Sequence, residues 1–213
     1  MKTDALIDLL ATGPVEVRGR LVTRRFGLAL AAGGLLVFVE MVAWLGVRPD
    51  LGEVMATPAM WIKLAFVLAA TAGALWVSVR LARPGLKPGA AWVALLAPFL
   101  LIWALAGAQM SMAPPGERLD LFFGLTWAEC PWCIAILSMP AFALSIWAMR
   151  GLAPTRLRLA GASAGLLSGT LAASIYTLHC PEMSAPFVGF WYVLGMLIPT
   201  AVGALVGPRL LRW

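Results

Sequence analysis

Six apolar stretches, each about 20 residues long, constrain the fold of this chain more than any other feature. A helix needs roughly 20 apolar residues to cross the hydrocarbon core of a bilayer, and segments of this length satisfy their own backbone polar groups in lipid only as helices. With 62% hydrophobic residues among 213, the chain leaves no room for a soluble catalytic domain. The sequence therefore predicts an all-α membrane protein, a six-transmembrane-helix bundle with spans at about 26–47, 59–79, 91–110, 130–149, 159–178 and 187–207.

The positively charged residues lie mostly on one side of these spans. Of the 16 Lys and Arg residues, only Arg48, Lys63 and Arg118 fall at or beyond the other side. Basic residues stay cytoplasmic, so the pattern predicts that both termini are cytoplasmic. We expect a cytoplasmic segment over 1–25, ending in a basic linker, and a transmembrane domain over 26–213. Topology and anionic lipid headgroups account for the net charge of +6, so direct contact with nucleic acid is not expected.

Residues 1–13 have the pattern of a short amphipathic helix that ends at Gly13-Pro14. Four Leu and Ile side chains form its apolar face, and Asp4 and Asp8 lie one turn apart on the other. Helices that lie on a membrane surface usually carry Lys or Arg on the polar face. The acidic face therefore favours docking in a protein groove over binding to the inner leaflet.

One carboxylate falls well inside an apolar stretch, at Glu40 in the first span. Ionisable groups in a membrane are costly, and they pair with one another or serve a function. Lys63 lies near the outer start of the second span, which runs antiparallel to the first. We therefore predict an intramembrane ion pair between Glu40 and Lys63.

The cysteines lie at equivalent heights on two neighbouring spans. Cys130 opens the fourth span and Cys180 follows the fifth, and the two spans have equal length and are joined by a short inner loop. An antiparallel hairpin with equal arms returns to its starting height, which is the outer side of the membrane. That compartment is oxidising, and the two residues are expected within disulfide reach of each other.

Four interpretations of these cysteines remain open. They are a permanent structural disulfide, a redox or metal sensor, a membrane thiol–quinone oxidoreductase, and a metal site formed by Cys130, Cys133, His179 and Cys180, a ligand set that suits zinc. The oxidoreductase needs a second outer cysteine pair, and only three cysteines are present. A metal-binding transporter is a further alternative, although few polar residues lie within the spans. No catalytic constellation is evident, and the odd number of cysteines leaves one thiol unpaired.

The chain resembles the NrsF family, named for negative regulator of sigma F. The resemblance covers the whole chain and is carried by the segment from Met1 to Leu10, the six spans, Glu129-Cys130-Pro131 and Cys180-Pro181. It implies a multi-pass anti-sigma factor of the bacterial inner membrane. Such a protein holds an extracytoplasmic-function sigma factor and releases it under metal or oxidative stress.

The resemblance also implies roles for particular residues. Cys130 and Cys180 are the expected sensors, while Cys133 is an addition to the family pattern. No cofactor is required, although a metal ion at the outer cysteines would fit the response. Contact with the sigma factor is assigned to the N-terminal segment, at Asp4, Leu6, Ile7, Leu9 and Leu10.

Overall fold

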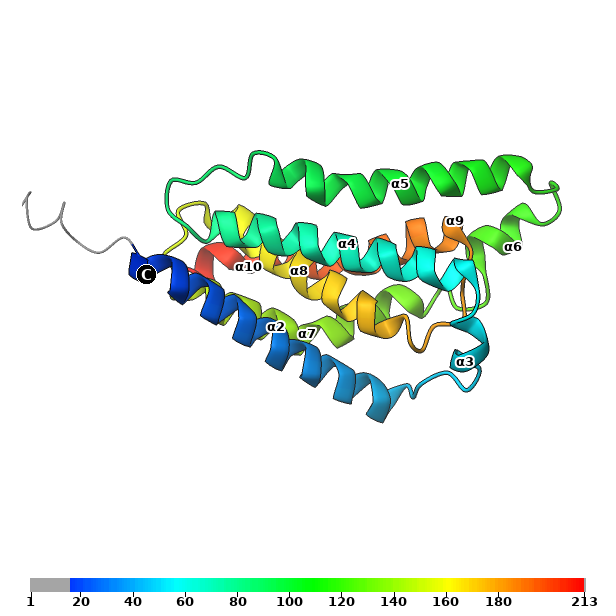
Figure 1. The fold of residues 1–213 in the computed structure, drawn as a ribbon, viewed down its shortest axis with the longest axis horizontal. Coiled ribbons are helices and arrows are strands. Elements are labelled where there is room, and N and C mark those ends of the chain that lie inside the picture. The colour runs from blue at the N-terminus through cyan, green and yellow to red at the C-terminus, as the bar shows by residue number, and fades with distance from the viewer. Residues whose placement is uncertain (1–15, 213) are drawn as a thin grey trace, which may run out of the picture.

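The structure is a computed structural model that describes residues 16–212, and within them it is entirely helical (Figure 1). The long helices lie roughly side by side, and short helices cap the connections between them. The elements are α2 (Glu16–Trp44), α3 (Leu51–Val54), α4 (Pro58–Leu81), α5 (Ala91–Met112), α6 (Arg118–Phe123), α7 (Cys130–Arg150), α8 (Leu157–Tyr176), α9 (Ala185–Phe187), a π-helical turn (Val188–Tyr192) and α10 (Val193–Leu210).

Six of these helical segments are long and apolar enough to cross a membrane, which confirms the predicted number. Their bounds agree with the predicted spans to within a few residues, except in the first. That segment covers Leu21–Trp44 and belongs to a helix that begins at Glu16. The basic residues that precede the predicted first span are therefore helical from Glu16 onward. The predicted amphipathic helix at 1–13 lies outside the described residues.

Helix α8 lies at the centre of the bundle and packs against α2, α4, α7 and α10. Its glycines make the contact with α10 very close. A Cβ atom on Gly161 would collide with the carbonyl of Gly203, and one on Gly165 would collide with the carbonyl of Pro199. Small residues allow such approach between membrane helices, where packing rather than hydrophobicity drives association. The predicted ridge of small residues thus serves packing within the chain.

The two ends of the bundle differ in chemistry. Helices α4, α7 and α10 each carry an arginine in their last turn, at Arg80, Arg150 and Arg209. We call this the basic end; α2 begins there (left in Figure 1). The opposite end carries Cys130, Cys180 and the short helices α3, α6 and α9, and we call it the cysteine end.

The close contact between α8 and α10 predicts a position-specific cost for adding one methyl group. Gly165→Ala should lower the free energy of unfolding by about 1–3 kcal/mol, because backbone cannot move aside as a side chain can. Gly27→Ala, on an exposed part of α2 with no atom within 4 Å of the new Cβ, should leave stability unchanged or raise it slightly. Thermal unfolding in detergent compares the two. Equal midpoints would contradict the packing argument.

Candidate functional site

Cys130 and Cys180 meet in the interior of the cysteine end. Both residues are fully buried, both are free thiols, and the two thiols lie close enough to influence each other's ionisation. Cys130 is the first residue of α7, where Pro131 occupies a position that proline tolerates. Cys180 follows the end of α8, and its backbone N–H donates to the carbonyl of Tyr176 at 3.0 Å. The equal-armed hairpin of α7 and α8 places the two thiols together, as the spacing predicts.

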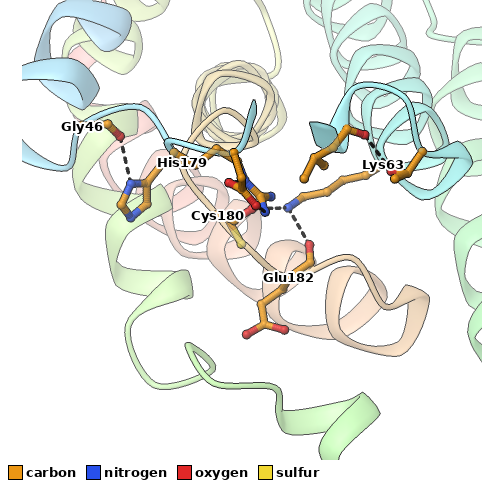
Figure 2. Close-up of polar contacts among 9 residues, drawn as sticks. Gly46, Lys63, His179, Cys180 and Glu182 are labelled. Carbon is orange, nitrogen blue, oxygen red and sulfur yellow. Dashed lines mark hydrogen bonds and ion pairs between the residues drawn. The ribbon is translucent and has the colours of Figure 1, made fainter. Parts of the chain in front are cut away.

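The other two residues of the predicted metal set do not join this pair. The half-buried Cys133 packs against the buried cluster that contains Tyr176. His179 is held through Nδ1, 2.9 Å from the carbonyl oxygen of Gly46, as Figure 2 shows. A carbonyl only accepts hydrogen bonds, so this contact fixes the proton on Nδ1. Across residues 16–212, no group of three or more His, Cys, Asp or Glu side chains is arranged to hold a metal ion.

Lys63 is buried beside the cysteine pair, with 1% of its surface exposed. Its ammonium donates hydrogen bonds to the carbonyl oxygens of Glu182 at 2.8 Å and Cys180 at 3.3 Å (Figure 2). It also lies 4.7 Å from the centre of the Tyr192 ring, within the range of a cation–π interaction. Backbone oxygens and an aromatic face therefore solvate this charge.

The predicted ion pair between Glu40 and Lys63 is wrong. The ammonium of Lys63 contacts carbonyl groups instead, and Glu40 is half-buried on α2. Helix α2 packs chiefly against α7 and α8 rather than α4, so these two spans are not close neighbours in space although they are adjacent in sequence. The ion pair within the described residues joins Arg48 to Asp50, with the Arg48 Nε 2.7 Å from the Asp50 carboxylate.

Arg48 connects the end of α2 to the same cysteine. Its Nη1 donates to the carbonyl of Cys180 at 3.2 Å, and its backbone N–H donates to the carbonyl of Leu178 at 3.1 Å. The side-chain hydrogen bond from Arg48 holds the pKa of the Asp50 carboxyl below its usual value, and the same bond raises the pKa of the guanidinium. Asp50 thus orients the guanidinium toward the carbonyl of Cys180.

Residues 178–185 form hydrogen bonds to several other parts of the cysteine end, and we call them the 178–185 segment. The Glu182 carboxylate accepts a hydrogen bond from the N–H of Leu125 at 2.7 Å, ahead of α7. Ser184 donates to the carbonyl of Leu121 in α6 at 2.7 Å, and the N–H of Ala185 donates to the side chain of Gln109 in α5 at 2.9 Å. These three bonds attach the 178–185 segment to α5, to α6 and to the chain ahead of α7.

The surroundings of Cys180 act on its ionisation in opposite directions. Burial disfavours the thiolate, whereas the hydrogen bond from Cys130 and the charge of Lys63 favour it, and the pKa of Cys180 lies below its usual value as a result. The Tyr192 hydroxyl is buried next to this thiol without a partner in good hydrogen-bond geometry. A low pKa makes a thiol a better nucleophile toward oxidants at neutral pH.

Sequence reasoning missed Arg48, Glu182 and Tyr192 as parts of this site. One signal was present for Arg48, because it is one of three basic residues outside the basic side of the spans. Lys63 is another, and it binds the same carbonyl. Glu182 and Tyr192 gave no such signal, since their roles depend on how the chain folds back after α8.

The fold and the site define a class: an all-helical protein with six helices of membrane-spanning length and a buried pair of free thiols at one end. The chain belongs to the NrsF family, whose profile, described as negative regulator of sigma F, matches residues 10–213.

Two curated proteins resemble the chain over their full lengths. It is 49% identical to the probable anti-sigma-F factor NrsF of Azospira oryzae over 213 residues, and 38% identical to the anti-sigma-F factor NrsF of Caulobacter vibrioides over 216 residues. In both comparisons 100% of each chain is covered. No solved structure matches the chain. The residues predicted to contact a partner, at Asp4, Leu6, Ile7, Leu9 and Leu10, lie outside the described residues.

Burial of the thiol pair predicts unequal labelling of the three cysteines. In the folded, reduced protein, maleimide should modify the half-buried Cys133 and spare Cys130 and Cys180. Unfolding in SDS should expose all three. Mass spectrometry of the labelled chain distinguishes these states, and Cys133→Ser provides the control that removes the fast-reacting thiol. Rapid labelling of Cys130 in the folded protein would contradict the burial seen here.

Proposed function

We propose that this protein is a membrane anti-sigma factor that holds an extracytoplasmic-function sigma factor and releases it when Cys130 and Cys180 are oxidised. The contact between the two buried free thiols carries the proposal. The names of the two relatives support binding of a sigma factor, and the lack of a catalytic constellation in the sequence fits a regulatory protein.

The proposed topology puts the thiols outside the inner membrane and the sigma factor inside. Basic residues favour the cytoplasmic side, and α4, α7 and α10 end in arginine at the end where α2 begins. The cysteine end would then face the oxidising compartment, where disulfides form and persist. The N-terminal segment before Glu16 would extend from the cytoplasmic end, within reach of a soluble partner.

The chemistry is a two-electron oxidation of the thiol pair. With hydrogen peroxide as the oxidant, two thiols and one peroxide give one disulfide and two molecules of water. The S–S bond is about 2.05 Å long, much shorter than any contact between two sulfur atoms that are not bonded to each other. Oxidation therefore draws the start of α7 and the end of α8 together, and the contacts made by Cys180 have to adjust.

The sigma factor is proposed to dock on the N-terminal segment. Its apolar residues Leu6, Ile7, Leu9 and Leu10, with Asp4 on the opposite face, fit the pattern of a helix that binds a groove. Binding through a short segment leaves the sigma factor soluble once it is released. The segment is attached directly to α2, so its position depends on that helix.

Deletion of residues 2–12 tests the docking segment. We expect the truncated protein to reach the membrane with the same thermal stability, because the deleted residues precede α2. Co-purification of a tagged extracytoplasmic-function sigma factor from the same genome should fall to background. Substituting Leu6 and Leu10 together by Ser gives a milder variant with the same expected direction. Unchanged co-purification with either variant would remove the segment from the proposal.

Substitution of single cysteines tests the sensor. Cys130→Ser and Cys180→Ser should each bind the sigma factor normally and retain it after peroxide treatment, because neither can form the disulfide. Cys133→Ser should release it like the unmodified protein, since the proposed disulfide does not include this thiol. Thiol trapping on non-reducing gels reports the disulfide, and co-purification reports release. Normal release from both Cys130→Ser and Cys180→Ser would leave the pair with a structural role only.

A further inference from the structure

The anti-sigma proposal leaves open how a change in two thiols at one end of the bundle reaches a partner at the other. We propose that Arg48 is the positioning residue that couples them: it holds helix α2 to the carbonyl of Cys180 while the thiols are reduced, and disulfide formation breaks this hold. The inference rests on the proposed function and adds to it the path of the signal.

The chain that follows α2, at residues 46–48, contacts the end of α8 and Cys180 through three hydrogen bonds. Arg48 binds the carbonyl of Cys180 at 3.2 Å and, through its backbone, the carbonyl of Leu178 at 3.1 Å. His179 binds the carbonyl of Gly46 at 2.9 Å. We call this contact, between 46–48 and 178–180, the α2 clasp. Of the three bonds, only the one from the Arg48 side chain reaches Cys180, the proposed sensor residue.

The bond between Arg48 and Cys180 is the part of the clasp that responds most directly to oxidation. The accepting carbonyl and the reacting thiol belong to one residue, so pulling the sulfur toward Cys130 moves the carbonyl as well. A length of 3.2 Å is already at the long end for an N–H···O hydrogen bond. A displacement of a few tenths of an ångström therefore weakens it strongly. Arg48 is also anchored to Asp50, which limits how far the guanidinium can follow.

Helix α2 is suited to carry this displacement along the bundle. It runs for 29 residues, from Glu16 to Trp44, and contains no proline. It lies at the edge of the bundle, where it packs chiefly against α7, the helix that begins at Cys130. Gly33 lets the two backbones approach closely at Ala141. Oxidation thus acts on α2 at its end, through Cys180, and along its side, through α7.

Lys63 also binds the carbonyl of Cys180, but it lies on a different helix and does not connect Cys180 to α2. Its ammonium belongs to α4 and is fixed by the carbonyl of Glu182 and the ring of Tyr192. The far end of α4 continues into the loop before α5, whereas the far end of α2 continues into the N-terminal segment. Lys63 therefore keeps the 178–185 segment in place, whereas Arg48 belongs to the α2 clasp, which links this segment to the helix attached to the docking segment.

The test is Arg48→Gln in the full-length protein in detergent. With reduced thiols, this variant should already release the sigma factor, with co-purification reduced at least about tenfold, a typical size for coupling between sites. The same loss should appear in the double variant with Cys130→Ser, because Arg48 acts after the disulfide. Hydrogen exchange of residues 16–25 should match that of the oxidised unmodified protein.

Three controls separate coupling from loss of stability. Asp50→Asn removes the charge that orients Arg48, and it should release part of the sigma factor in the reduced state, less than Arg48→Gln does. Gly165→Ala loosens the bundle far from the clasp and should still release only on oxidation. Arg48→Lys keeps the charge but lacks the forked donor, and it should release in the reduced state, to a smaller extent than Arg48→Gln.

The inference is overturned if Arg48→Gln, or Arg48→Lys when the former does not fold, holds the sigma factor when reduced and releases it on oxidation as the unmodified protein does. Release by Gly165→Ala without oxidant would overturn it too, since destabilisation alone would then explain the effect. Failure of the proposed function looks different: the unmodified protein forms the disulfide and keeps its sigma factor.

Discussion

The buried ammonium of Lys63 is the interaction on which the cysteine end depends. A buried charge needs hydrogen-bond partners or an opposite charge, because its desolvation is costly. Here it binds the carbonyls of Cys180 and Glu182 and faces the ring of Tyr192. Those carbonyls follow the end of α8, where no helix supplies them with donors. The ammonium and the two carbonyls thus satisfy each other's hydrogen-bonding capacity. The chain between α8 and α9 is held in one conformation as a result.

This arrangement fixes the position of the two thiols. Because Cys180 is held by its backbone, its side chain stays against Cys130 without a covalent bond. Glu182 and Ser184 then attach the same segment to the chain before α7 and to α6. A pair of thiols in a rigid pocket meets the geometric needs of a disulfide at little cost in entropy. The same rigidity means that shortening the distance between the sulfurs strains the surrounding bonds instead of being absorbed.

The sequence predicted those features that leave a trace in composition or spacing. The six helices follow from apolar stretches of the length of a bilayer, and the meeting of Cys130 with Cys180 follows from two helices of equal length. The partner of Lys63 could not be predicted, because backbone carbonyls are present at every residue. Glu40 was the only carboxylate within an apolar span, yet the packing of α2 against α7 and α8 keeps it from α4. The start of α2 at Glu16 was missed because a helix can extend beyond its apolar part.

The packing of the helices determines which of them can move. Helix α8 is locked to α10 where the glycines of one meet the backbone of the other, and sliding at such a contact would create collisions. Helix α2 has no comparable contact with α8 and exposes a large apolar side, including Leu28, Leu35 and Val39, that lipid can cover in any position. A displacement at the cysteine end therefore meets less resistance along α2 than at the contact between α8 and α10. The bundle thus divides into a fixed part built on α8 and α10, which holds the thiols, and a peripheral helix that can shift relative to it.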